Sequence, residues 1–100
     1  MDFEVSVDAA KAICTVGGKV TAQSAPQLES AFGRLDSAVR DIDVDLSRVT
    51  FLSSAGLRVL VGAQKLASRR GGAFRILHPQ DAICEVFDVT GLADVFKIVR

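Results

Sequence analysis

Two adjacent hydroxyls, those of Ser53 and Ser54, stand between an apolar segment and a long amphipathic one. The apolar run over residues 42–46, followed by a short polar turn and Phe51-Leu52, is typical of a strand. From residue 55 onward, apolar side chains recur at helical spacing, so the serines are expected at a helix start. Unpaired N–H groups and the positive end of the helix dipole favour an anion there.

The chemistry favoured at this position is phosphorylation of a hydroxyl rather than nucleophilic catalysis. A phosphate would add about two negative charges at a point where the backbone can hold them. A second interpretation is open, because either serine can act as an N-cap whose hydroxyl accepts an N–H one turn on. Residues 53–54 therefore predict a serine switch or a helix cap.

The first half of the chain predicts a hairpin and a helix. Alternating residues over 3–7 and 12–16 indicate two antiparallel strands joined by a turn at 8–11, and Gly17-Gly18 is expected to break the second strand. Ser24-Ala25-Pro26 is typical of a helix start, with Ser24 as its cap. The apolar face of this helix is expected to comprise Leu28, Ala31, Phe32, Leu35 and Val39.

The second half alternates strands and helices. A strand at 42–46 precedes the helix that follows the serines, and Gly71-Gly72 end that helix after a solvated Arg69-Arg70. A strand at 73–77, a short helix begun by Gln80 or Asp81 and ended by Gly91, and a strand at 95–99 complete the chain. This order predicts one α/β domain over residues 1–100: a mixed, largely parallel sheet of four to five strands with helices packed on it.

Composition excludes several classes of protein. The 100 residues are 49% hydrophobic and 24% charged, as in a folded domain rather than a disordered chain. Lysine plus arginine and aspartate plus glutamate each number 12, so no basic face indicates nucleic acid. The apolar stretches are too short for membrane insertion, and the acidic N-terminus lacks a signal sequence. A cytoplasmic location is expected.

The chain has no recognisable catalytic or cofactor motif. It lacks a nucleophile elbow, a phosphate-binding glycine loop and a dinucleotide fingerprint, and it has a single histidine. We therefore expect no enzyme activity, cofactor or metal ion. Asp41, Asp43 and Asp45 are expected to be solvated on one face of a strand. Cys14 and Cys84 are expected to be buried thiols, with a redox disulfide as the open alternative.

Three stretches together resemble the STAS domain, the fold of bacterial anti-sigma factor antagonists. The first runs from Asp45-Leu46-Ser47 through Val49 and Phe51-Leu52 to Ser54-Ala55-Gly56-Leu57. The second is Gly18-Lys19-Val20-Thr21, and the third is Val86-Phe87-Asp88-Val89-Thr90-Gly91-Leu92. The resemblance covers essentially the whole chain in the order of the family.

The resemblance implies a partner switch. Ser54 aligns with the phosphorylatable serine of the family, and Ser53 is the second candidate. The implied partners are an anti-sigma factor with serine-kinase activity and a histidine-kinase-like ATPase fold, and a serine phosphatase. The unmodified chain would bind the kinase and release its sigma factor. The expected docking surface comprises Thr21, Gln23, Ser24, Ser53, Ser54, Ala55, Gly56 and Leu57.

Two positions depart from the family pattern. Regulated members usually carry aspartate where this chain has Ser53 and Thr21, and those acids would lie near the modified hydroxyl. Their absence predicts slow phosphorylation of Ser54, or none. Two rival functions therefore stay open: a STAS subunit of a lipid ABC-transport complex and a stressosome-like scaffold. Gly56 is expected either to permit close packing or to belong to the docking surface.

Overall fold

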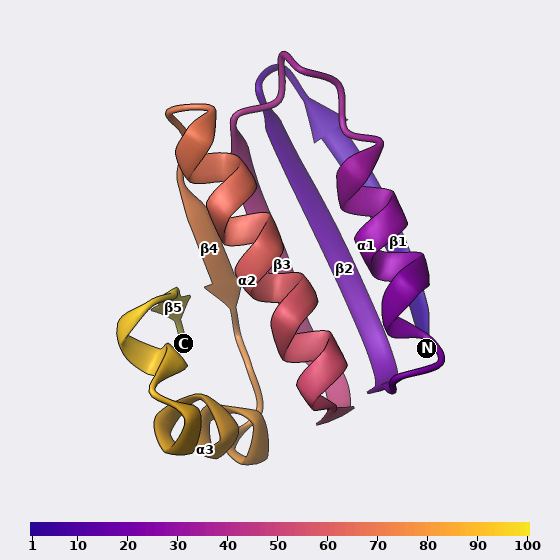
Figure 1. The fold of residues 1–100 in the computed structure, drawn as a ribbon, viewed down its shortest axis with the longest axis vertical. Coiled ribbons are helices and arrows are strands. Elements are labelled where there is room, and N and C mark those ends of the chain that lie inside the picture. The colour runs from indigo at the N-terminus through magenta and orange to yellow at the C-terminus, as the bar shows by residue number, and fades with distance from the viewer.

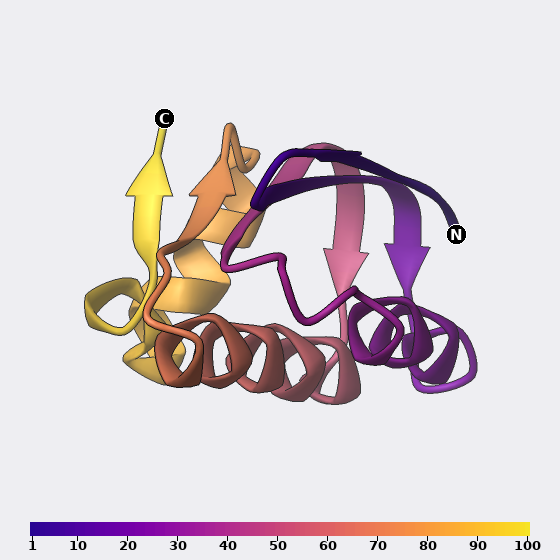
Figure 2. The same ribbon diagram turned by 90° about the horizontal axis from the view of Figure 1, so that it is seen from above.

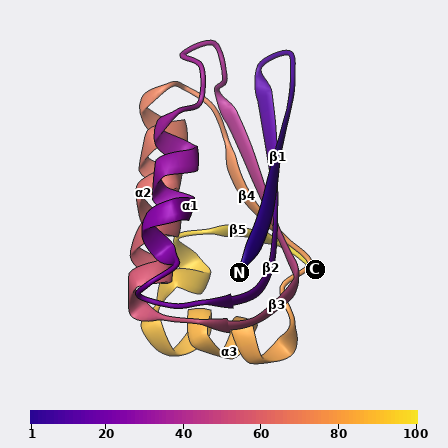
Figure 3. The same cartoon turned by 90° about the vertical axis from the view of Figure 1, so that its right-hand side faces the viewer.

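The protein is a sheet of five strands with helices packed on it (Figure 1), and the computed structural model describes all 100 residues. The layer formed by α1 and α2 is seen end-on in Figure 2, and α3 lies across the lower end of the molecule, below α1 and α2 (Figure 3). The elements in chain order are β1 (Asp2–Asp8), β2 (Lys11–Val20), α1 (Ala25–Gly33), β3 (Asp41–Leu52), α2 (Ser54–Arg69), β4 (Phe74–Leu77), α3 (Asp81–Thr90), a 3₁₀ turn (Leu92–Asp94) and β5 (Lys97–Val99).

The sheet has the predicted mixed topology. Its strand order is β1-β2-β3-β4-β5, with β1 antiparallel to β2 and every other neighbouring pair parallel. Parallel neighbours need a crossover, and α1, α2 and α3 provide the three crossovers. The α/β fold expected from the alternation of elements is confirmed.

The middle strands are longer than the sequence predicts. Gly17-Gly18 does not break β2, and the polar residues after Leu46 do not form a turn, because β2 and β3 pair in parallel as far as Val20 and Leu52. Two register shifts, between Thr15 and Gly17 and between Gly18 and Lys19, absorb the irregularity. Gly18 supplies the positive φ of +82° that an irregular ladder needs there.

One hydrophobic core of 20 buried residues fills the space between the sheet and the helices. The helix-facing rows of the strands include Cys14 and Val16 from β2 and Ile42 and Val44 from β3. Leu28 and Phe32 come from α1, Leu60 from α2 and Phe87 from α3. Strand β2, as far as Val16, and strand β4 therefore bury alternate residues, as strands with one covered face do.

Helix α1 ends earlier than its predicted apolar face. It stops at Gly33, so Leu35 and Val39 lie outside it, although Val39 is buried in the core. Arg70, expected to be solvated, holds this segment in place. Its guanidinium donates to the carbonyl oxygens of Leu35, Asp36 and Val39 at 3.3, 3.0 and 2.8 Å. Local sequence patterns could not predict these contacts, because they join residues more than 30 positions apart.

Asp43 is buried, which contradicts the prediction that it is solvated. The residue is 2% exposed, and its carboxylate accepts from Arg75 Nε at 2.8 Å and pairs with Lys11 Nζ at 2.9 Å. Burial alone would raise the pKa of Asp43. The hydrogen bonds and charges of Arg75 and Lys11 outweigh that effect and hold the pKa below its ordinary value of 3.8.

We expect Asp43→Asn to lower the free energy of unfolding by about 1–3 kcal/mol near pH 7, because it removes the charge that two cations contact. A carboxyl whose folded pKa is lowered stabilises the fold above its unfolded pKa and loses that contribution as the pH falls through the folded value. The difference between variant and wild type should therefore shrink below about pH 4. Urea unfolding at a series of pH values measures it.

Asp88→Asn, at an exposed position of α3, is the matched control and should change stability by less than about 0.5 kcal/mol. A difference at Asp43 that does not depend on pH would mean that its charge is not what stabilises the fold.

Candidate functional site

The candidate site lies where β2 and β3 end side by side. Val20 and Leu52 are register partners, and the N–H of Ser53 donates to the carbonyl oxygen of Val20 at 2.9 Å. From this point β2 leads through a turn into α1, and β3 leads directly into α2. Both helices therefore begin at the end of the sheet where β2 and β3 terminate (Figure 1).

The two serines have different surroundings. Ser53 is extended, with φ −75° and ψ 167°, and caps α2: its Oγ accepts the N–H of Gly56 at 3.1 Å, and its carbonyl oxygen accepts that of Leu57 at 2.9 Å. Ser54 is the first residue of α2 and is exposed, whereas Ser53 is half-buried. The sequence left open whether these serines cap the helix or offer a hydroxyl for modification. In the structure Ser53 is the cap, and the neighbouring Ser54 is exposed.

The turn before α1 is held by Thr21 and Ser24. The N–H of Thr21 donates to Ser24 Oγ at 2.9 Å, and the N–H of Ser24 donates to Thr21 Oγ1 at 3.2 Å. Ser24 occupies the cap position of α1 but makes no side-chain cap bond to the helix, so its predicted capping role is wrong in detail. Both residues are half-buried, and Gln23 between them is exposed.

Gly56 is a packing residue. It is buried, and a Cβ at this position would lie 2.7 Å from Leu52 Cδ1 and 2.8 Å from Val20 Cγ1. The start of α2 therefore rests directly on the ends of β2 and β3, and the absence of a side chain at Gly56 permits this close packing. Ala55 and Leu57 beside it are half-buried against the core and still present some surface.

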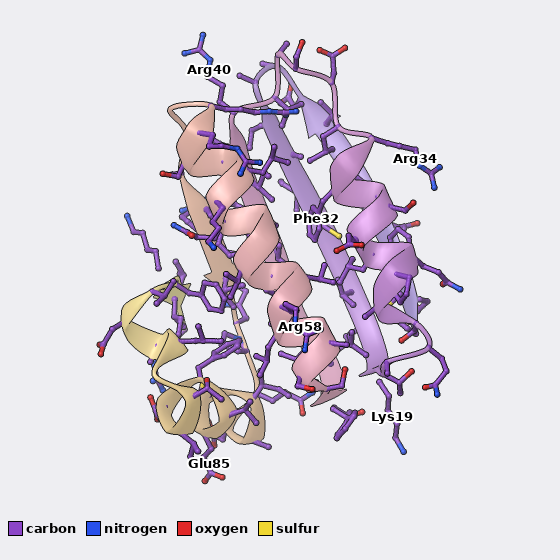
Figure 4. All side chains as sticks on the ribbon, in the orientation of Figure 1. Lys19, Phe32, Arg34, Arg40, Arg58 and Glu85 are labelled. Atoms are coloured by element: carbon purple, nitrogen blue, oxygen red, sulfur yellow. The ribbon has the colours of Figure 1, made fainter.

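A shallow hollow between α1 and α2 adjoins the serines. It measures about 170 Å³ and is lined by Ala22, Ala25, Pro26, Glu29, Ala55, Arg58 and Val59. Arg58 and Lys19 both project near the start of α2 (Figure 4). Sequence reasoning missed Arg58, although it follows Ser54 by four residues and such pairs share a helix face. Neither α1 nor α2 has an acidic residue in its first turn.

Comparison with known proteins places this architecture in a family. The family described as "Mlab, STAS domain" matches residues 3–100. The chain belongs to the STAS family. A similar protein of Bacillus subtilis, the "Anti-sigma-B factor antagonist", is 30% identical over 83 residues, which are 83% of this chain and 76% of that protein. The resemblance inferred from the motifs is therefore confirmed.

Solved structures agree on the STAS fold. A putative anti-sigma factor antagonist of Thermotoga maritima superposes with a TM-score of 0.89 at 23% identity, covering 98% of this chain and 86% of that one. The anti-sigma factor antagonist SpoIIAA in its unphosphorylated form gives 0.83 at 19% identity, covering 99% and 89%. At these identities the likeness concerns the fold alone.

The remaining candidate groups of this STAS domain lie apart from the serines or are inert. Cys14 and Cys84 are both free and buried, and burial raises the pKa of the Cys14 thiol to about 11. A thiol with so high a pKa is a poor nucleophile at neutral pH. No three histidine, cysteine, aspartate or glutamate side chains lie close enough together to hold a metal ion. None of the helices has the length and hydrophobicity of a membrane span.

We expect Gly56→Ala to lower the free energy of unfolding by about 1–3 kcal/mol, because the added methyl group overpacks the contact with Val20 and Leu52. Gly62→Ala is the matched control on the same helix, since a Cβ there meets nothing within 4 Å. It should stabilise the protein by about 0.5–1 kcal/mol, as alanine in place of a helical glycine does. Urea unfolding of both variants measures the contrast, and equal effects would contradict the packing role.

Alanine at the two serines should separate the cap from the free hydroxyl. Ser53→Ala removes the acceptor of the Gly56 N–H and should cost about 0.5–2 kcal/mol of stability. Ser54→Ala removes an exposed hydroxyl and should change stability by less than about 0.5 kcal/mol. Thermal or urea unfolding measures both. A larger loss at Ser54 than at Ser53 would reverse the assignment.

Proposed function

We propose that this STAS domain is a cytoplasmic anti-sigma factor antagonist that acts by binding, not by catalysis. Its partner would be an anti-sigma factor with serine-kinase activity, and binding would release the sigma factor held by that kinase. Phosphorylation of Ser54 would abolish binding, and a serine phosphatase would restore it. The observation that carries the proposal is the exposed hydroxyl of Ser54 at the start of α2, beside a serine already used as the cap.

The surroundings of Ser54 suit a phosphate. Modification there would put about two negative charges at the N-terminal end of α2, where the dipole favours them. Arg58, one turn further along the same helix, supplies a cation, and no carboxylate lies in the first turn of α2. The phosphorylated domain should therefore stay folded, and the charge should act on the partner rather than on the fold.

The proposed docking surface consists of residues that are at least partly exposed where β2 and β3 end. Among the predicted residues, Gln23 and Ser54 are exposed and Thr21, Ser24, Ser53, Ala55 and Leu57 are half-buried, whereas Gly56 is buried. The hollow between α1 and α2 extends this surface through Ala22, Pro26 and Arg58. A charge at the centre of such a surface can cost several kcal/mol of binding energy when it is desolvated or repelled.

The relatives support the same proposal. A protein named for antagonism of an anti-sigma factor shares 30% of its aligned residues with this chain. SpoIIAA, which shares the fold, has also been solved in a phosphorylated form.

Purification of the tagged chain from its native cells, with mass spectrometry of the bound proteins, tests the partner. A histidine-kinase-like ATPase is expected. A transporter ATPase, or a large assembly on sizing, would instead support the lipid-transport or scaffold rival.

We expect Ser54→Asp to weaken binding of the purified kinase partner by about tenfold or more, which corresponds to about 1.4 kcal/mol. The same variant should unfold at an equal or higher temperature, because an acid at the start of a helix is favourable. Ser37→Asp is the matched control: it adds the same charge at an exposed serine in the loop after α1 and should leave affinity unchanged. Isothermal titration measures affinity. Unchanged affinity for Ser54→Asp would refute the charge mechanism.

Ser53→Asp should increase the rate of phosphorylation of Ser54 by the kinase partner. Aspartate is as good an N-cap as serine, so the cap of α2 is kept while the acid of the regulated relatives is restored. Transfer of labelled phosphate from ATP gives the rate. Ser53→Asn keeps the cap without the charge and serves as the control. Equal rates for the two variants would show that the missing acid does not limit phosphorylation.

A further inference from the structure

The outer strand β1 has an apolar row that the helices only partly cover. Phe3, Val5 and Val7 lie opposite Val16, Cys14 and Ala12 of β2. Directly opposed residues share a face, and these β2 partners are fully buried on the helix side. Yet Val5 is 39% exposed and Val7 is 53% exposed. The row therefore belongs to the face of the sheet that carries the core, and it extends beyond the cover that α1 provides.

The uncovered row forms one wall of a groove. This β1 groove, of about 340 Å³, is lined by Phe3, Val5, Val7, Ala31, Arg34, Leu35 and Asp36. Its far wall is formed by the end of α1 and the segment that follows. The groove therefore lies at the opposite end of α1 from the proposed docking surface around Ser54. Figure 3 views the molecule from the side on which β1 and α1 lie. It is the largest of the four hollows on the protein.

The other row of β1 is acidic. Asp2, Glu4 and Asp8 alternate with the apolar residues and are exposed, with Ser6 between them. A single ion pair, Asp2 to Arg48 at 3.8 Å between two exposed side chains, touches this row. Because β1 is the last strand of the sheet, the outer edge of its backbone has no strand beside it. Such an edge can accept a further strand.

We propose that β1 binds an extended segment of another protein in which apolar residues alternate with lysine or arginine. The segment adds a strand to the sheet: its apolar side chains enter the β1 groove, and its basic side chains face the carboxylates of the acidic row. Backbone hydrogen bonds along the edge supply affinity, and the alternation supplies specificity. This site is independent of Ser54.

A second copy of the chain fits this edge poorly. Antiparallel pairing of β1 with itself about Val5 would oppose Phe3 to Val7, but it would also oppose Asp2 to Asp8. Like charges directly opposite one another destabilise a sheet. The other free edge, β5, spans only three residues and offers too short a partner. The charges on the acidic row therefore favour a basic strand from a different protein.

A peptide of alternating valine and lysine, matched to the 7 residues of β1, is the probe. An otherwise identical peptide with glutamate in place of lysine is its control. The lysine peptide should bind at least about tenfold more tightly, and its affinity should fall with added salt. In NMR hydrogen-exchange measurements it should protect the β1 amides that point away from β2. Failure of the lysine peptide to bind, or protection elsewhere than β1, would overturn the proposal.

Variants of the protein localise the effect. Glu4→Lys should lower affinity for the lysine peptide by about tenfold and raise it for the glutamate peptide. Val7→Asp should lower binding of both, whereas Val89→Asp, the same change at an 87% exposed valine of α3, should not. Thermal unfolding confirms that each variant is folded. Protection of the β1 amides without peptide, together with a dimer on sizing, would show that a second copy occupies the edge and would contradict the proposal.

Discussion

The parallel pairing of β2 with β3 up to Val20 and Leu52 is the constraint on which the site depends. The last hydrogen bond between the two strands runs from the Ser53 N–H to the Val20 carbonyl oxygen, so both strands end at the same level. After β2, and again after β3, the chain leaves the sheet at this end and begins a helix. The absence of a side chain at Gly56 lets α2 start directly on the strand ends. The starts of α1 and α2, with their polar residues, therefore lie together at this end of the sheet.

This geometry divides two roles between adjacent hydroxyls. A helix start needs an acceptor for its first N–H groups, and Ser53 provides one while keeping an extended backbone. The next residue is then directed outward at the positive end of the dipole, which is the position of Ser54. A side chain there can gain or lose a charge without disturbing the cap or the core. The switch that we propose therefore acts on the surface of the domain while its interior stays the same.

Local patterns were sufficient to predict much of this structure. The hairpin, the helix after the serines and the helix stop at Gly91 each depend on residues close in sequence, and the motifs identified the family. What failed was non-local. The strand character of Arg48 and Val49 comes from pairing with Gly17 and Gly18 of β2. The burial of Asp43 comes from Lys11 and Arg75 on neighbouring strands. The contacts of Arg70 likewise join distant segments.

The site itself was partly predictable. The motif gave the two serines and the residues of the α1 turn, but spacing could not tell which serine caps the helix. That depends on backbone torsion angles and on one hydrogen bond. Arg58 could have been found from its four-residue spacing to Ser54 once the helix start was fixed. The β1 groove could not, because it arises from where α1 ends relative to the outer strand.

The most direct test of the central claim is to locate phosphate on the peptide that contains Ser53 and Ser54. The protein would be isolated from its native cells under phosphatase inhibition and analysed by fragmentation mass spectrometry. The account predicts phosphate on Ser54 and an unmodified Ser53. Phosphate on Ser53, or a peptide unmodified under every growth condition tested, would contradict the assignment of Ser54 as the switch.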